Sequence, residues 1–143
     1  MQSFDEVRAA LDELTPDAAL EGPWSLGVAL SHCAQSIELS MTGYPELKGP
    51  LFRATIGPLA KRRFLSKGEM SHDTAAPVAG APDIPEDTSA SVGMARLLAA
   101  MAAFEAFDGT PADHLAYGPC TKDEYQALHA IHVADHLRTL KSG

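Results

Sequence analysis

The stretch that most constrains this chain runs from Thr121 to Leu140 and reads TKDEYQALHAIHVADHLRTL. Its apolar residues recur at helical spacing, and Thr121 with Glu124 forms a capping box that predicts where the helix begins. Three of the six histidines of the chain lie here, and at 3.6 residues per turn they fall within roughly 60° of one another. Apolar side chains share this face, so we expect these histidines to point towards a core: His129, His132 and His136.

A second helix is expected from about residue 23 or 25 to residue 42, and it is apolar on two nearly opposite sides. Such a helix is buried against several neighbours, which places His32 inside the protein. On the last helix, His132 and His136 are one turn apart, so both imidazoles can reach one metal ion. Helix bundles build metal sites from facing helices in this way.

The candidate metal ligands are therefore His32, His132 and His136. Three neutral imidazoles with one open position make a catalytic type of site, in which a bound water loses its proton near neutral pH. His129 and Asp135 flank the pair, and either could orient an imidazole from outside the ligand set, while His129 could also replace one ligand. The alternative is a set of ordinary core histidines with hydrogen-bond partners, because H-x-x-x-H pairs are common by chance.

The rest of the chain predicts further helices and no convincing strand. Helical spacing covers residues 3–14, 50–65 and 89–107, and the second of these is expected to kink or split at Pro58. A Ser-x-x-Glu capping box at residues 3–6 opens the first. We therefore expect an all-α fold, a four-helix bundle with an additional short kinked helix.

Between these helices lies one long irregular segment, residues 66–88, which contains three prolines and two glycines. Loops of this length are often functional or mobile. A lone loop histidine is usually exposed, so we leave His72 out of the candidate site. The 143 residues suit a single domain, and we expect it to span residues 1–143.

The charge balance excludes several classes of partner. A net charge of −8 argues against a nucleic-acid-binding surface and against docking on anionic membranes. The only basic cluster, residues 61–63, is either a solvated helix end or a patch that attracts an anionic substrate.

The chain contains no run of 18 apolar residues and no signal-peptide core, so we expect a cytoplasmic location. In that compartment Cys33 and Cys120 are expected to be reduced. Cys33 and His32 point about 100° apart on one helix, so both should not bind one ion.

Two stretches of the sequence resemble the DUF1569 family within the DinB/YfiT-like superfamily of helical-bundle metalloenzymes. One stretch includes the Trp-Ser-Leu and Ser-His-Cys-Ala-Gln-Ser-Ile-Glu motifs, and the other ends in His-Val-Ala-Asp-His-Leu-Arg. The resemblance covers most of the chain, and its motifs are short. The matching positions are residues 24–26, 31–38 and 41–45 in the first stretch and 114, 117–119, 121–124 and 132–138 in the second.

This resemblance implies an up-down-down-up bundle, frequent dimers, and metal ligands at His32, His132 and His136. Characterised relatives in the superfamily include thiol-dependent transferases and a thiol-dependent isomerase that use zinc or nickel-type ions. The chain departs from the family pattern at Asp135 and Thr139, where a histidine and a glutamine are common. The departure puts in doubt any orienting role tied to these two positions and leaves the three ligands intact.

The resulting functional hypothesis is a divalent-metal-binding protein, a metal-dependent thiol transferase or hydrolase that acts on a small molecule. Zinc or nickel would be the ion, and the protein would be a homodimer. The alternative hypothesis is a non-catalytic helical module that dimerises or binds a small ligand. The alanine-rich stretch 89–107 motivates this alternative, because it could provide a flat interface.

Overall fold

The computed structural model describes residues 1–15 and 17–141, so residues 16, 142 and 143 of the expected domain lie outside the described part. Six helices and no strand are present in the described residues, which confirms the helical fold class. None of these helices is both long and apolar enough to cross a membrane. The helices are α1 (Phe4–Asp12), α2 (Leu26–Thr42), α3 (Pro50–Ala54), α4 (Ile56–Lys67), α5 (Ala90–Ala106) and α6 (Lys122–Leu137).

Hydroxyl side chains set where four of the helices begin. In each, the capping oxygen accepts a hydrogen bond from the backbone N–H three residues on, which satisfies a donor that the helix leaves free. The predicted capping box at the start of α6 is confirmed. At the start of α1 the box is incomplete, because Glu6 Oε1 accepts from the backbone N–H of Gln2. The four caps are Ser3, Ser25, Ser89 and Thr121.

The segment predicted to kink at Pro58 breaks three residues earlier. Thr55 ends α3 and begins α4, so Pro58 lies in the first turn of α4. A proline there costs no hydrogen bond, since the first N–H groups of a helix have no partner within it. The buried Gly57 brings this turn against the connector before α6: an added Cβ would lie 1.8 Å from the carbonyl oxygen of Ala116.

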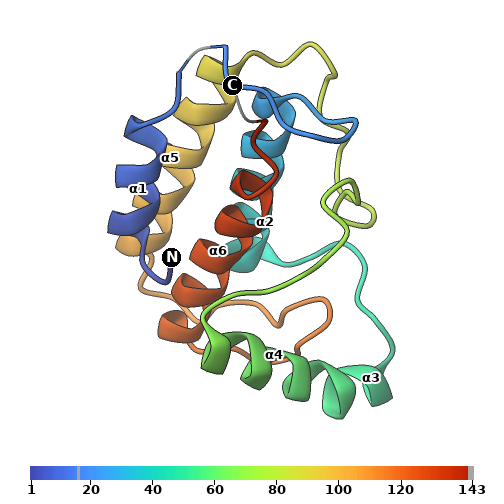
Figure 1. Ribbon diagram of the computed structural model, residues 1–143. Coiled ribbons are helices and arrows are strands. Elements are labelled where there is room, and N and C mark those ends of the chain that lie inside the picture. The colour runs from blue at the N-terminus through green and yellow to red at the C-terminus, as the bar shows by residue number, and fades with distance from the viewer. Residues whose placement is uncertain (16, 142–143) are drawn as a thin grey trace.

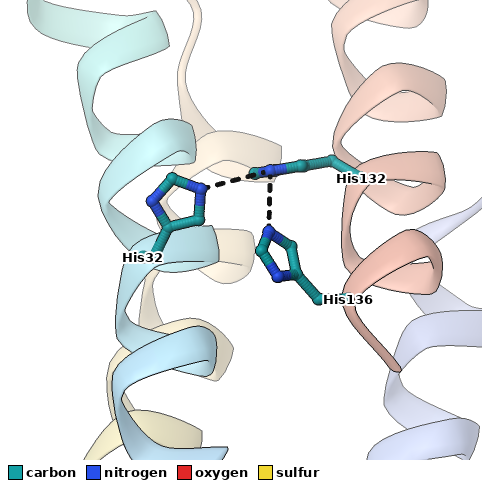
Figure 2. A group of neighbouring side chains, drawn as sticks. All are labelled: His32, His132 and His136. Atoms are coloured by element: carbon teal, nitrogen blue, oxygen red, sulfur yellow. Dashed lines mark hydrogen bonds between the residues drawn. The ribbon is translucent and has the colours of Figure 1, made fainter. Parts of the chain in front are cut away.

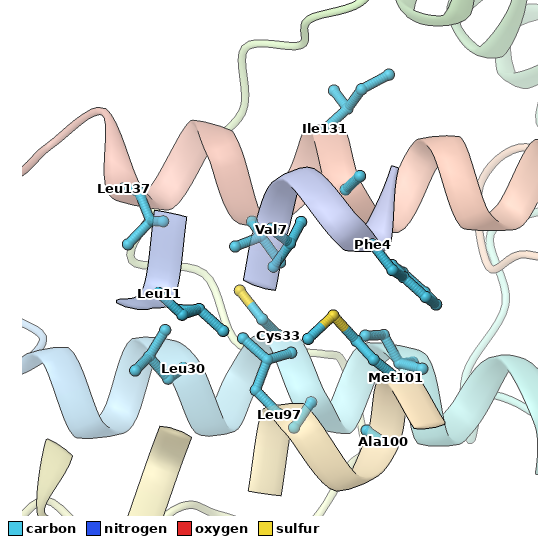
Figure 3. Close-up of a cluster of buried hydrophobic side chains, with 14 of the residues drawn as sticks. Phe4, Val7, Leu11, Leu30, Cys33, Leu97, Ala100, Met101, Ile131 and Leu137 are labelled. Carbon is cyan, nitrogen blue, oxygen red and sulfur yellow. The ribbon is translucent and has the colours of Figure 1, made fainter. Parts of the chain in front are cut away.

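Figure 1 shows α1, α2, α5 and α6 lying side by side, with α3 and α4 across one end of the group. Helix α2 packs along α5 and also contacts α6, while α1 contacts both α5 and α6. Figure 3 shows that side chains of these four helices meet in one core. The labelled members are Phe4, Val7, Leu11, Leu30, Cys33, Leu97, Ala100, Met101, Ile131 and Leu137.

Both cysteines are free and buried. Cys33 points into the core (Figure 3), and burial raises the pKa of its thiol. It is therefore separated from the histidine next to it in sequence, as the 100° spacing of helical neighbours predicts.

The last helix ends at Leu137, three residues before the predicted end. The chain turns aside there because it pairs with the segment before α2: Glu21 N–H donates to the Thr139 carbonyl over 2.7 Å. The N–H of Lys141 donates to the Ala19 carbonyl over 2.8 Å. The N–H groups of Thr139 and Leu140 still donate to carbonyls three residues back, and the pairing closes one end of the helix group.

Candidate metal centre

Three histidines from two helices converge at the interface of α2 and α6 (Figure 2). Nε2 of His132 lies 3.3 Å from Nε2 of His32 and 3.2 Å from Nε2 of His136. His32 is 4% exposed and His136 is 2% exposed, while His132 is half-buried. The structure therefore brings together the three side chains that the sequence singles out as ligands.

Hydrogen bonds alone do not satisfy this arrangement. A neutral imidazole nitrogen carries either one proton or one lone pair. Nε2 of His132 can therefore form one ordinary hydrogen bond, yet it lies close to both other ε nitrogens. A cation between them accepts a lone pair from each. A tetrahedral ion with bonds of about 2.0–2.1 Å holds its imidazole nitrogens about 3.3–3.4 Å apart, close to the spacings found here. The donor set thus fits a divalent ion such as zinc.

Burial keeps these imidazoles neutral. It is the main cause that lowers the pKa of His32 to about 4 and that of His136 to about 3, and repulsion between the clustered histidines adds to it. The pKa of His132 is lowered well below its ordinary value for the same reasons. Near neutral pH all three therefore present lone pairs, which is the form that binds a metal.

One polar atom of the cluster has no partner. Nδ1 of His32 is buried and forms no hydrogen bond within the described residues. A buried polar atom without a partner costs free energy. A metal bond at Nε2 would place the ring proton on Nδ1, for which the described residues supply no acceptor.

Trp24 packs against the side of this cluster. Its indole lies 5.0 Å from the His32 ring and 5.9 Å from the His136 ring, measured between centroids. Because the flat indole covers both imidazoles, it holds their ring planes and helps to keep water from the site.

The two residues predicted to orient the ligands lie in different surroundings. His129 is buried away from the trio, where its Nε2 lies 3.0 Å from the Ser40 hydroxyl. That hydroxyl donates to the Ile37 carbonyl, so the His129 nitrogen is the donor to it. Asp135 is 3% exposed and contacts a loop histidine and Arg138 in place of the trio. Their orienting roles remain predictions.

The loop histidine is His72, and our expectation that it is exposed is wrong. Its side chain is 27% exposed, and its Nε2 lies 3.2 Å from Nε2 of His136. Residues 66–88 show no periodicity. The adjacent residues His72 and Asp73 are the sequence signal that could have indicated chemistry in this segment. A fourth imidazole therefore joins the cluster from outside the helices.

Two cavities border the site. One of about 400 Å³ is lined by His32, His72 and His132 together with three tyrosines: Tyr44, Tyr117 and Tyr125. The other, of about 730 Å³, reaches His32 beside Trp24. A small molecule can therefore approach the histidines from two sides.

The basic cluster lies elsewhere. Lys61 pairs with Glu124 at 3.3 Å and donates to the Pro119 carbonyl, so it joins α4 to the start of α6. None of residues 61–63 lines either cavity at the histidines. This placement gives no support to a substrate patch, and residues 61–63 lie in the middle of α4, so the expected helix end is wrong as well.

A family model described as "Protein of unknown function (DUF1569)" matches residues 1–142. The chain belongs to the DUF1569 family. The resemblance noted in the sequence is thereby confirmed at the level of the family. Searches of curated proteins and of solved structures found no match for this DUF1569 chain.

Proposed function

We propose that this DUF1569 protein binds one divalent metal ion through His32, His132 and His136. The observation that carries this proposal is the meeting of three ε nitrogens, 3.2–3.3 Å apart where they are adjacent, from two helices. Zinc or nickel suits an all-imidazole donor set. Burial supports the proposal, since it keeps these side chains neutral and ready to bind.

We further propose that the protein is a DinB-like enzyme, a metal-dependent thiol transferase or hydrolase. An ion in this site would lower the pKa of a bound thiol or water, which produces a nucleophile at neutral pH. The side-by-side course of α1, α2, α5 and α6 in Figure 1 supports the DinB-like assignment. The site lies between two of those helices, as in other bundle metal centres.

The chain itself would supply orientation, substrate binding and exclusion of water. The rigid helices α2 and α6 hold the imidazoles, and Trp24 covers two of them. The 400 Å³ cavity next to His132 suits a small molecule, and its tyrosines offer apolar faces and hydroxyl groups. Its size favours a small substrate over a protein chain.

Elemental analysis of untagged protein tests the metal site. We expect about one zinc or nickel per chain. His132→Ala should lose the ion, since the central imidazole contacts both others. His114→Gln is the matched control: His114 lines the same cavity, but its Nδ1 accepts hydrogen bonds from the N–H groups of Ala116 and Tyr117. This variant should keep the ion.

Circular dichroism of each variant separates loss of the ion from loss of the fold. Wild-type protein that holds no ion after dialysis against zinc and against nickel would contradict the proposal. A loaded protein should then support thiol transfer or hydrolysis in a broad screen. If metal-loaded protein is inactive with every compound, the proposed metal site stands and the proposed enzyme activity is contradicted.

The cavity also suits a second candidate function, a module that binds a small ligand without changing it. The same measurements distinguish the two functions. Such a module should bind an apolar compound equally well in wild type and in His132→Ala, whereas the enzyme should need the ion.

A homodimer remains a prediction, and the exposed alanines on the outer face of α5 would suit its interface: Ala95, Ala99, Ala102 and Ala106.

A further inference from the structure

The fourth imidazole of the cluster comes from the segment between α4 and α5. Nε2 of His72 lies 3.2 Å from Nε2 of His136, which equals the separation of His136 from His132. The His72 ring also lies 4.8 Å from the His132 ring and 4.9 Å from the His136 ring, measured between centroids. His72 therefore contacts two members of the cluster, while the three helical histidines form the set whose ligand atoms all lie within 4.8 Å of one another.

A buried carboxylate holds this imidazole in place. Nδ1 of His72 lies 2.5 Å from Oδ2 of Asp135, and the backbone N–H of His72 donates to the same oxygen over 3.2 Å. The other carboxylate oxygen pairs with Arg138. Because a carboxylate accepts hydrogen bonds, the ring proton of His72 belongs on Nδ1, and Nε2 presents its lone pair to the cluster.

A carboxylate, a histidine and a metal in this order recur in metal sites, where the carboxylate fixes the tautomer and the ring orientation. Asp135 is 3% exposed, so it has been withdrawn from water to make these contacts. Arg138 balances its charge and also donates to the Met70 carbonyl at the start of the same segment, over 3.4 Å. Two contacts from α6 thus hold the loop at the cluster.

The spacing agrees with that of two ligands on one ion. Two imidazole nitrogens bound to a tetrahedral ion lie about 3.3–3.4 Å apart. Nε2 of His72 lies 3.2 Å from Nε2 of His136.

We propose that His72 is a fourth ligand of the same ion and that Asp135 is its positioning residue. The inference rests on the proposed metal site. It gives the segment between α4 and α5 a role, since metal binding would fasten this loop to α6. A substrate would then have to displace His72 or add as a fifth ligand, as zinc permits.

Metal titration of the metal-free protein tests this inference without any measurement of activity. Cobalt(II) is the probe, because its visible absorption depends on the number and arrangement of its ligands. We expect His72→Ala to bind one ion about tenfold or more weakly than wild type, with a changed cobalt spectrum. Asp135→Asn should weaken binding by about 10- to 100-fold, as loss of an outer partner does. Ser71→Ala, an exposed neighbour in the loop, is the control and should match wild type.

A second readout uses zinc and limited proteolysis. Zinc should slow cleavage between residues 68 and 89 in wild type and in Ser71→Ala, and should have little effect in His72→Ala. Equal affinity, an unchanged cobalt spectrum and equal protection in His72→Ala would overturn the fourth ligand while leaving the three-histidine site. Wild-type protein that binds no cobalt or zinc would overturn both proposals.

Discussion

The indole of Trp24 lies parallel to the imidazole of His136, with 9° between the ring planes and 5.9 Å between their centroids. The same indole lies 5.0 Å from the His32 ring. Trp24 is the only tryptophan of the chain. Its fluorescence therefore reports on a single place, the side of the candidate metal centre.

We predict that cobalt or nickel quenches Trp24 fluorescence in wild-type protein, with an endpoint near one ion per chain. The physical reason is contact, because the indole packs against two rings that would hold the ion. A fluorescence titration of metal-free protein measures it. His132→Ala should respond only at much higher metal concentrations. If His132→Ala is quenched at the same metal concentrations as wild type, the ion binds at a site other than the three histidines.

A second prediction concerns acid stability and His129. Burial lowers the pKa of this core imidazole to about 3, whereas an unfolded histidine titrates near 6.5. Between these values the unfolded chain binds more protons, so the free energy of unfolding falls as the pH drops below about 6.5. The limiting slope for one such histidine is about 1.4 kcal/mol per pH unit.

His129→Gln removes this titration and can still donate to the Ser40 hydroxyl. The stability of wild type relative to this variant should therefore decrease from pH 7 to pH 4. Urea unfolding in the presence of a chelator measures the difference without any contribution from metal. A difference that stays constant with pH would show that His129 does not carry the effect.

A third prediction concerns the crossing of α2 and α5. A Cβ added at Gly93 would lie 2.5 Å from the carbonyl oxygen of Gly27, and a Cβ at Gly27 would lie 2.1 Å from that of Thr88. These neighbours are backbone atoms and cannot turn away. Gly93→Ala should thus lower the free energy of unfolding by about 1–3 kcal/mol, the range typical of overpacking.

Gly49→Ala is the control for this substitution. A Cβ at Gly49 meets nothing within 4 Å, and the φ angle there is −56°, so alanine fits. Chemical denaturation should place this variant within about 0.5 kcal/mol of wild type. Equal stability of Gly93→Ala and Gly49→Ala would contradict the close approach of α2 and α5 at Gly93.

The capping box of α6 yields a fourth prediction. The Thr121 hydroxyl accepts from the Glu124 N–H over 3.1 Å, and Glu124 Oε1 accepts from the Thr121 N–H over 2.9 Å. Thr121→Ala should lower the free energy of unfolding by about 1 kcal/mol, because the first turn loses an acceptor. Thr121→Ser retains the hydroxyl and should restore most of the loss. Thermal unfolding followed by circular dichroism compares the three proteins.

The helices and the three helical histidines could be predicted because they follow from periodicity. A residue four positions along a helix lies on the same face, so His132 and His136 could be paired from their spacing alone. The apolar surroundings of His32 likewise placed it inside. His129 shares that face of α6, but it lies about one turn from His132 and contacts Ser40 instead, which spacing along one helix cannot resolve.

Contacts between distant segments could not be predicted in this way. The end of α6 depends on pairing with residues 19–21, and the break at Thr55 depends on how α4 packs. His72 reaches the cluster because of the path of an irregular loop, and no period describes such a path. Asp135 stands next to His136 in the sequence. The contact of Asp135 with His72 depends on tertiary structure, which the sequence pattern does not describe.

The ε nitrogens of His32 and His132 lie 3.3 Å apart although 100 positions of the chain separate the two residues. An ion shared by them would act as a cross-link, comparable to a disulfide that closes a very long loop. Closing such a loop removes conformational freedom from the unfolded chain and so favours the folded one. The supply of metal in the cell would then influence how much of this protein stays folded.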